Sequence, residues 1–348
     1  MLKPTIPFVD LRGKTLIDLL RAYPDKAAAL VKGGRRSYGI LSDAAAALAL
    51  PLADKRSLAW LKRSENPYLY EIDTFAHILE IPGIYTFNIA FEWGCTGGVY
   101  RNGEHVSMLR VLDWPFKALG QHVMVLLQSS KAGEFYNISW PGVTGMFTGL
   151  APGRFSAAIH QAPMRRHGLT FPGDWMKNRK MLSRSTYLPP AHLLRQVFEQ
   201  AESYETAKSM LARTPIAVPA IFILAGTREG QGCVIERLET AAEIHELGAQ
   251  QQVVAANHFT SSFAQVGKGW WPREPDSEGR YRYGCGLHGH EVELAHFDWL
   301  KAPMINEYTR LCAAMDAASG RLMAQGYEGI VQATALFHRP GTKSEAEA

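Results

Sequence analysis

The sequence predicts an α+β protein in which strands and helices form separate layers. Segments typical of strands gather in two blocks, at about 94–159 and 219–256, and helical segments lie before, between and after these blocks. Such grouping favours layered packing over an alternating, doubly wound parallel sheet. No Walker-type phosphate loop, which would indicate an alternating nucleotide-binding sheet, is present in the sequence.

The composition is that of an ordinary folded protein. Of the 348 residues, 47% are hydrophobic and 20% are charged, which excludes a disordered or low-complexity chain and allows a sizeable core. The net charge is +4, and no run of five or more like charges concentrates it. We therefore expect no nucleic-acid partner.

Cysteine usage and hydropathy predict a cytoplasmic protein. Four cysteines without a Cys-x-x-Cys pair are too few for a secreted disulfide framework. The first 14 residues contain two prolines and lack the apolar core of a signal peptide. The most apolar stretch, 216–226, is shorter than the roughly 20 residues that a membrane helix needs. We expect no integral membrane segment.

The first quarter of the chain is predicted to be helical. Between residues 14 and 88, apolar side chains recur three and four positions apart, which is the spacing of a buried helix face. Pro24 and the glycine pair at 33–34 are expected to interrupt the helices. Asn66 is predicted to cap the last long helix, with the following proline in its first turn. The expected helical segments include residues 16–20, 27–31, 58–62 and 68–79.

A β-hairpin is predicted directly after this helical region. The segment that follows Gly94 reads CTGGVYRNGEHVSMLRVLDW, in which two strand-like runs flank Asn102-Gly103. Asn-Gly favours a type I′ turn between two antiparallel strands. Cys95 is therefore expected to begin the first strand of the hairpin.

The remaining elements alternate in blocks, with no internal repeat. Two helices are predicted between residues 190 and 211, the second capped by Ser203, and a late helix is predicted at about 305–324. The tail from Arg339 is polar and is expected to fray. Strands are predicted at 122–127, 134–140, 155–159, 219–224, 233–237, 242–246 and 253–256.

Three short motifs have a functional and an ordinary interpretation. The histidines of His288-Gly289-His290 could begin a metal site, but without a third ligand they are better interpreted as histidines of a solvated loop. The basic run 165–167, Arg-Arg-His, could bind an anionic substrate or form a solvated loop. The pair Trp270-Trp271 suits a pocket rim, an interface or the core.

Cys95 is the strongest candidate for chemistry. It lies at the start of a strand between Gly94 and the small residues Thr96-Gly97-Gly98, where its backbone is open to close approach. On these residues alone, a buried structural cysteine remains the alternative.

The hairpin resembles the nucleophile hairpin of the acid ceramidase, N-acylethanolamine acid amidase and choloylglycine hydrolase group of N-terminal nucleophile hydrolases. That group carries Cys-Thr or Cys-Ser followed by an Arg-x-x-Asp-Phe/Trp element, for which this chain has Arg110-Val111-Leu112-Asp113-Trp114. Further similar stretches follow in the same order, and the resemblance extends over about 68–259. These stretches are PGVTGMFTGLAPGRFS, AVPAIFILAGTREGQGCVIER and VVAANHF.

The resemblance implies a four-layered αββα sandwich made as a proenzyme. Self-cleavage between Gly94 and Cys95 would leave residues 1–94 as a helical chain and residues 95–348 as the catalytic chain, which are expected to stay associated. The new α-amino group, with a pKa of roughly 7.7 to 8, would act as the base for the thiol. Asp113 would hold this amine, and Arg110 would favour the thiolate, unless the two are an ordinary cross-strand ion pair.

The resemblance also implies an oxyanion site. The side-chain amide of Asn257 is the expected first donor, with a turn-capping role as the alternative, and a backbone N–H near His160 and Gln161 is the expected second donor. The family commonly has Asn where this chain has His160, so only the backbone role is carried over. Arg280 is the chosen candidate for a late active-site arginine, with Arg282 as the other.

The expected function is therefore hydrolysis of linear N-acyl amides, such as ceramide, N-acylethanolamines or related lipid amides, through an acyl-enzyme on Cys95. No metal or organic cofactor is expected, and a homo-oligomer is left open. A bile-salt or penicillin V acylase-like specificity, transfer of the acyl group to an amine, and a non-processed acyl-binding protein of the same fold remain as alternatives. Apolar pocket walls are expected from Phe116, Trp140, Phe147 and Trp270.

Overall fold

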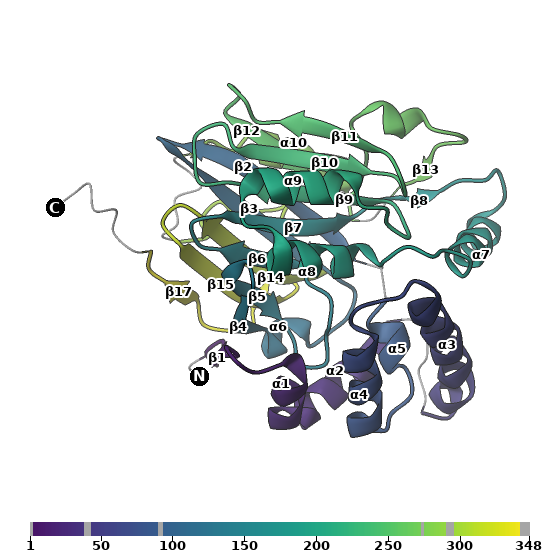
Figure 1. Ribbon diagram of the computed structural model, residues 1–348. Coiled ribbons are helices and arrows are strands. Elements are labelled where there is room, and N and C mark those ends of the chain that lie inside the picture. Colours follow the sequence, from purple (N-terminus) through teal and green to yellow (C-terminus); the bar gives the residue numbers. More distant parts are fainter. Residues whose placement is uncertain (1–2, 38–42, 90–92, 273–274, 290–295, 342–348) are drawn as a thin grey trace.

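Two β-sheets packed face to face form the centre of the molecule, with helices outside them. This arrangement is seen in a computed structural model (Figure 1) that describes residues 3–37, 43–89, 93–272, 275–289 and 296–341. Helices α8 (Pro190–Gln200) and α9 (Tyr204–Arg213) cross the front of the sandwich in that view. Among the described residues, none of the helices combines the length and the apolar character that crossing a bilayer requires.

The first sheet has eight strands, and α8 and α9 pack on its outer face. Its strands are antiparallel except for the edge pair β1 and β4, which is parallel. In spatial order they are β1 (Phe8–Asp10), β4 (Met124–Ser130), β5 (Gly133–Ser139), β6 (Thr148–Ala151), β7 (Phe155–Gln161), β9 (Ala220–Ala225), β10 (Gly232–Arg237) and β11 (Ala242–Glu246).

The second sheet has seven antiparallel strands and carries the predicted nucleophile hairpin. A separate two-stranded sheet joins β8 (Met164–Arg165) and β13 (Trp270–Trp271). The strands of the second sheet are β12 (Gln252–Ala255), β2 (Gly94–Asn102), β3 (His105–Asp113), β14 (Thr309–Asp316), β15 (Arg321–Glu328) and β16 (Val331–Gln332), with β17 (Phe337–Arg339) also paired to β15.

The two faces of β2 define the layer order. A Cβ on Gly97 would touch Ile223 of the first sheet, whereas Tyr100 donates from its hydroxyl to the carbonyl of Gly284 in α10 (Ser277–Cys285) at 2.8 Å. Since alternate residues of a strand point to opposite faces, one face of β2 meets the first sheet and the other meets α10. The layers therefore run helix, sheet, sheet, helix, which confirms the predicted αββα architecture.

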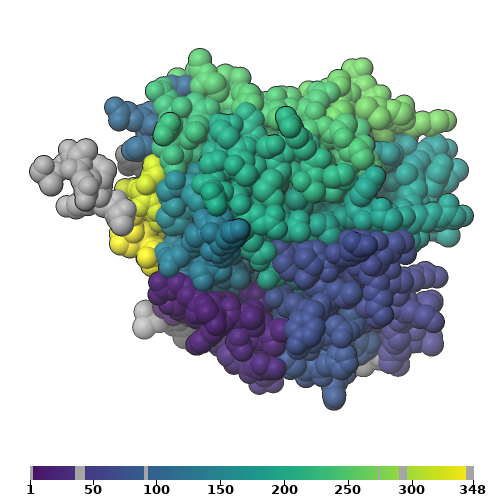
Figure 2. All heavy atoms as spheres, in the orientation of Figure 1, coloured from purple at the N-terminus to yellow at the C-terminus, as the bar shows by residue number. Residues whose placement is uncertain are grey.

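Five helices formed by residues before Cys95 cover one end of the sandwich. In Figure 2 they form a continuous block along its base. The glycine pair at 33–34 does not interrupt the helices as predicted, but lies inside α2. The position needs a glycine because a Cβ at Gly33 would come within 2.6 Å of the Phe116 ring. The helices are α1 (Leu16–Ala22), α2 (Pro24–Ser37), α3 (Asp43–Arg63), α4 (Leu69–Leu79) and α5 (Ile84–Phe87).

Two predicted helix and turn details are shifted by one or two residues. Helix α4 begins at Leu69, although the Asn66 side chain still accepts a hydrogen bond, from the Tyr68 N–H at 3.0 Å. In the hairpin, Asn102 pairs with His105, so the loop is Gly103 and Glu104 and only Gly103 has a positive φ. A type I′ turn needs a positive φ at both positions, so the predicted turn type was wrong. The Ser203 cap of α9 is confirmed.

The predicted late helix at 305–324 was wrong, because this segment contains β14 and the start of β15. All eight residues of β14 are buried, since the strand lies in the middle of the second sheet with both faces covered. Such a strand shows no polar alternation, and the Leu, Ala and Met that fill it favour helices in isolation. Most of the tail predicted to fray, 342–348, lies outside the described residues.

A partly buried polar network joins α4 to α8, and so joins the helical end to the sandwich. The Arg195 guanidinium donates to Glu71 at 2.7 Å and to Glu199 at 2.8 Å, and the Tyr68 hydroxyl donates to Glu199 at 2.8 Å. The Asn66 amide donates to Nδ1 of buried His192 at 2.8 Å. These contacts bury charge and polarity with their partners in place, so removal of one partner leaves another without compensation.

We predict that His192 makes the protein less stable in mild acid. Burial lowers the pKa of His192 to about 3 from its usual 6.5. A histidine held neutral in the folded state stabilises the fold above pH 6.5, and this contribution falls as the unfolded chain takes up a proton. Between pH 7 and pH 5 the loss from this side chain is about 2 kcal/mol.

Urea unfolding of wild type and His192→Gln at both pH values measures the effect. The variant should lose less stability than wild type between pH 7 and pH 5, while His77→Gln, which changes an exposed histidine of α4, should not alter that difference. Equal losses in wild type and His192→Gln would contradict the prediction.

Candidate active site

The register of the β2–β3 hairpin places two of the predicted catalytic residues, Cys95 and Arg110, on one face. Cys95 pairs with Leu112, Gly97 pairs with Arg110, and Gly94 pairs with Asp113. Directly paired residues share a face of an antiparallel sheet, so Cys95 and Arg110 both point toward the first sheet. Asp113 belongs to the other face.

Cys95 is completely buried. Its Sγ lies 3.7 Å from the carbonyl oxygen of Ile159 on β7, and its backbone N–H donates to Oδ1 of Asn257 at 2.7 Å. Burial raises the pKa of the Cys95 thiol, while the neighbouring guanidinium of Arg110 acts in the opposite direction. In this arrangement the thiol is predominantly protonated.

Arg110 holds a positive charge beside the thiol. It is completely buried, and its Nε donates to the hydroxyl of Thr148 at 3.2 Å. Its terminal nitrogens, Nη1 and Nη2, have no hydrogen-bond partner among the described residues. A buried guanidinium with two free donors is suited to stabilise a thiolate or an oxyanion next to it.

Asp113 is not the ion-pair partner of Arg110. Its Oδ1 accepts a hydrogen bond from the Thr309 hydroxyl at 2.9 Å, and its Oδ2 lies 3.5 Å from Nη1 of Arg280. Asp113 and Arg280 are both completely buried. The alternative of a cross-strand pair between Arg110 and Asp113 is therefore wrong.

Arg280, on α10, contacts the nucleophile from the side opposite Arg110. It donates to the carbonyl of Cys95, to Thr96 Oγ1 at 2.6 Å and to Oδ1 of Asn257 at 2.9 Å. The other candidate, Arg282, is exposed. Of the two arginines considered from the sequence, the structure brings only Arg280 to the candidate site.

Asn257 follows β12 and is also completely buried. Its Oδ1 accepts from both the Cys95 N–H and Arg280, while its Nδ2 donates to the carbonyl of Gln161 at 2.8 Å. One Nδ2 hydrogen remains for a further acceptor. The Asn257 side chain therefore links three other segments of the chain, whereas the alternative role would only cap a turn.

His160 and Gln161 end β7 next to these groups. His160 is completely buried with its Nδ1 3.2 Å from the carbonyl oxygen of Ala256, and burial together with Arg110 lowers its pKa well below 6.5. Gln161 accepts a hydrogen bond at Oε1 from the Trp93 N–H at 2.7 Å. The structure therefore places both residues beside the other candidate site residues.

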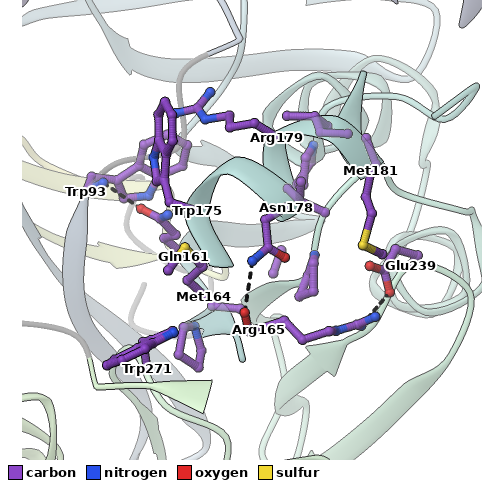
Figure 3. A pocket seen from close by; sticks show the side chains of 18 of the residues that line it. Trp93, Gln161, Met164, Arg165, Trp175, Asn178, Arg179, Met181, Glu239 and Trp271 are labelled. Carbon is purple, nitrogen blue, oxygen red and sulfur yellow. Dashed lines mark hydrogen bonds and ion pairs between the residues drawn. The ribbon is translucent and has the colours of Figure 1, made fainter. Parts of the chain in front are cut away.

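A cavity of about 560 Å³ begins at these residues (Figure 3). Its wall includes Trp93, Ile159, His160 and Gln161, but within the described part of the chain Cys95 does not line it. Helix α7 (Phe171–Leu182), β8 and the segment before β9 form much of the rest, and most of the lining side chains are apolar. An ion pair between Arg165 and Glu239, 2.9 Å long, lies in the wall.

The pocket walls predicted from the sequence were wrong. Phe116, Trp140 and Phe147 are buried in the core, and Trp270 donates to the carbonyl of Phe263 instead of lining the cavity. The aromatic wall residues are Trp93, Phe171, Trp175, Tyr187 and Trp271. Helix α7 was not predicted. The only available signal was its cluster of large apolar side chains, Phe171, Trp175, Met176 and Met181, which the structure leaves exposed.

Two of the short motifs come together at the rim of the cavity. Arg165 pairs with Trp270 across β8 and β13, and the guanidinium carbons lie over indole rings at 5.4 Å for Arg165 on Trp270 and 4.7 Å for Arg166 on Trp271. Such cation–π contacts stabilise the rim. Both arginines of the basic run therefore have partners within the protein.

The histidine motif gains no further support. His288 is exposed and His290 lies outside the described residues, and within the described ranges no group of three His, Cys, Asp or Glu side chains could hold a metal ion.

The sequence also contains a Gly-x-Gly-x-x-Gly spacing at 284–289. It lies at the C-terminal end of α10, not at the start of a helix after a strand, so it is not a dinucleotide fingerprint.

A protein-family model matches the part of the chain that contains the candidate site. Residues 95–264 match the model of the linear amide C-N hydrolases, choloylglycine hydrolase family. The matched part of the chain contains Cys95, Arg110, Asp113 and Asn257.

The chain is also similar to acid ceramidases and N-acylethanolamine-hydrolyzing acid amidases. It is 30% identical over 223 residues to the acid ceramidase of Heterocephalus glaber, covering 58% of this chain and 55% of the relative. It is 27% identical over 206 residues to the N-acylethanolamine-hydrolyzing acid amidase of Oryctolagus cuniculus, covering 57% and 55%. The aligned region thus spans about 55% of the length of these curated relatives.

One solved structure with detectable similarity is an N-acylethanolamine-hydrolyzing acid amidase ortholog of Caenorhabditis elegans. The match has a TM-score of 0.49 and 20% sequence identity, and it covers 71% of this chain and 100% of the other.

We predict that Gly97→Ala disrupts the contact between the two sheets. A Cβ at Gly97 would lie 2.6 Å from the carbonyl oxygen of Leu109 and 3.1 Å from Ile223. Backbone and packed side chains would have to move, at a cost of about 1–3 kcal/mol. Urea unfolding measures this, and Gly286→Ala, whose Cβ would meet nothing closer than 3.4 Å, should change stability by less than about 1 kcal/mol. Wild-type stability of Gly97→Ala would contradict the described packing.

Proposed function

We propose that the chain is a cysteine N-terminal nucleophile amidohydrolase that cleaves linear N-acyl amides. The observation that carries this proposal is the environment of Cys95: its thiol lies beside the free donors of Arg110 while its backbone nitrogen is held by Asn257. A nucleophile and a nitrogen that can become its base are thus parts of one residue.

Self-cleavage is the first step of the proposed mechanism. The peptide bond between Gly94 and Cys95 is hydrolysed, which leaves a carboxylate on Gly94 and an α-amine on Cys95. The amine would keep the position of the present N–H, 2.7 Å from Oδ1 of Asn257. Trp93, which lines the cavity, would become the second-last residue of the smaller chain. Once the bond between Gly94 and Cys95 is broken, the end of the smaller chain that carries Trp93 could move and give the thiol access to the cavity.

Acyl transfer then uses the residues that surround the thiol. The α-amine takes the Sγ proton, and the thiolate attacks the amide carbonyl carbon. The remaining Nδ2 hydrogen of Asn257 and a backbone N–H near Gln161 would stabilise the oxyanion, with the charge of Arg110 close by. The leaving amine takes the proton, and water, activated by the same α-amine, hydrolyses the thioester on Cys95. These reaction steps use no metal or organic cofactor.

The cavity supports an apolar acyl group as the part of the substrate that it holds. Apolar and aromatic side chains dominate its wall, and such pockets are typical of sites for hydrophobic ligands. Lipid amides such as ceramides and N-acylethanolamines are the proposed substrates, with bile-salt or penicillin V-type amides as the alternative. If the 94–95 bond stays intact, the buried thiol favours a protein that binds acyl groups without hydrolysing them.

The two chains would remain associated after cleavage. The contacts of Arg195 with Glu71, and of Tyr68 with Glu199, cross from the helical segment to the catalytic segment without using the chain connection. A cytoplasmic location remains a prediction.

We predict that the purified protein contains two fragments, of 94 and 254 residues. The larger fragment should begin Cys-Thr-Gly, because cleavage is expected at Gly94-Cys95. Intact mass measurement and N-terminal sequencing, at neutral and mildly acidic pH, provide the test. Cys95→Ala should remain whole under the same conditions, while Cys233→Ala, which changes another buried thiol, should be cleaved like wild type. A wild-type chain that stays whole would make the acyl-binding alternative the better interpretation.

We predict that Val218→Phe shifts acyl specificity toward shorter chains. Val218 lines the cavity, so the larger ring would fill space that a long acyl group needs. The kcat/KM for a long-chain N-acyl amide should fall by about tenfold or more, with short-chain amides affected by less than about threefold. Val331→Phe, at a position that is 63% exposed, is the matched control. An equal fall for all chain lengths would contradict a role of this cavity in acyl binding.

A further inference from the structure

The peptide unit that precedes Asn257 is held at both ends by side chains from other elements. Its carbonyl, that of Ala256, lies 3.2 Å from Nδ1 of His160 on β7. Its N–H, that of Asn257, donates to the hydroxyl oxygen of Ser277 on α10 at 2.9 Å. His160 and Asn257 are completely buried, and Ser277 is buried.

These contacts fix the hydrogen-bond roles of His160. A carbonyl oxygen can only accept, so Nδ1 carries a proton and donates it; in the neutral ring Nε2 is then an unprotonated acceptor. This Nε2 has no hydrogen-bond partner in the described part of the chain. The low pKa of His160, which burial and Arg110 produce, is consistent with this neutral tautomer.

Ser277 contacts two consecutive residues and lies one helical turn before Arg280. Its hydroxyl accepts from the Asn257 N–H and lies 2.7 Å from Nδ1 of His258. Arg280 meanwhile donates to Oδ1 of Asn257 at 2.9 Å. Helix α10 therefore holds the backbone of Asn257 with one residue and its side chain with another.

We propose that His160 and Ser277 are positioning residues for Asn257, which act by fixing the plane of the Ala256–Asn257 peptide. This inference rests on the proposed function, in which Asn257 holds the α-amine and stabilises the oxyanion. A peptide that is fixed at both ends cannot rotate, so the Asn257 amide keeps its aim at the reacting atoms. The sequence left His160 with only a backbone role, and this assignment gives its side chain a separate one.

The test compares pairs of variants that keep or remove one hydrogen bond. His160→Leu removes the donor at similar volume, and His160→Asn keeps a donor at the equivalent position on the side chain. Ser277→Ala removes the acceptor, and Ser277→Thr keeps it. Each variant is assayed for the fraction cleaved, for kcat and KM per cleaved molecule with an N-acyl amide, and for Tm.

We expect His160→Leu and Ser277→Ala each to lower kcat by about tenfold to a hundredfold with KM changed less than about threefold, because displacement of a catalytic group affects the reaction more than binding. His160→Asn and Ser277→Thr should recover most of the lost kcat. The double variant should lose less than the product of the two single losses, since both residues act through one peptide. Ser203→Ala, which removes a hydroxyl that accepts a backbone N–H far from the site, should leave kcat unchanged.

Two outcomes would overturn the inference in an active wild-type enzyme. One is unchanged kcat in both His160→Leu and Ser277→Ala. The other is a fall in kcat that the conservative variants do not recover, which would indicate a general structural role. If His160→Leu fails to fold, the Ser277 pair decides the matter. An inactive, uncleaved wild type would instead contradict the proposed function itself.

Discussion

The register of the β2–β3 hairpin is the constraint on which the candidate site depends. It sets Cys95 opposite Leu112 and Gly97 opposite Arg110, so that thiol and guanidinium share the face toward the first sheet. A slip of one residue would move the thiol to the α10 face and away from Arg110. Two features act on this register. The small loop at Gly103 and Glu104 constrains the end of the hairpin, and the close approach of Ile223 on β9 to Gly97 constrains its face.

Elements with a strong local signal could be predicted from the sequence. The hairpin, the Ser203 cap and the strand block after 219 carry turn residues, caps and β-branched runs that act over a few residues. The hairpin at 309–328 could not be recognised in this way, because a strand buried on both faces has no alternation to show. That error also hid Thr309, whose hydroxyl donates to Asp113.

Contacts between side chains that are far apart in the sequence were harder to predict. Arg110 and Asp113 are close in sequence, and an ion pair between them was the alternative to their catalytic roles. Asp113 instead meets Arg280, 167 positions further along, because strand parity places it on the other face. The cavity walls were misplaced for a related reason: aromatic residues near the nucleophile in sequence fill the core, and α7 supplies a wall from outside the sandwich. Composition indicates apolar walls but not which residues form them.

The network around Arg195 has a consequence for folding. Under the proposed self-cleavage, the helices and the sandwich fold as one chain and are then separated covalently, while Glu71, Tyr68 and Asn66 keep them docked. From that moment the mature molecule is a heterodimer, and its reassembly after denaturation would require an encounter between two solutes. Its apparent stability would then depend on dilution, and its persistence on the rate of dissociation more than on an equilibrium that a single chain could reach again.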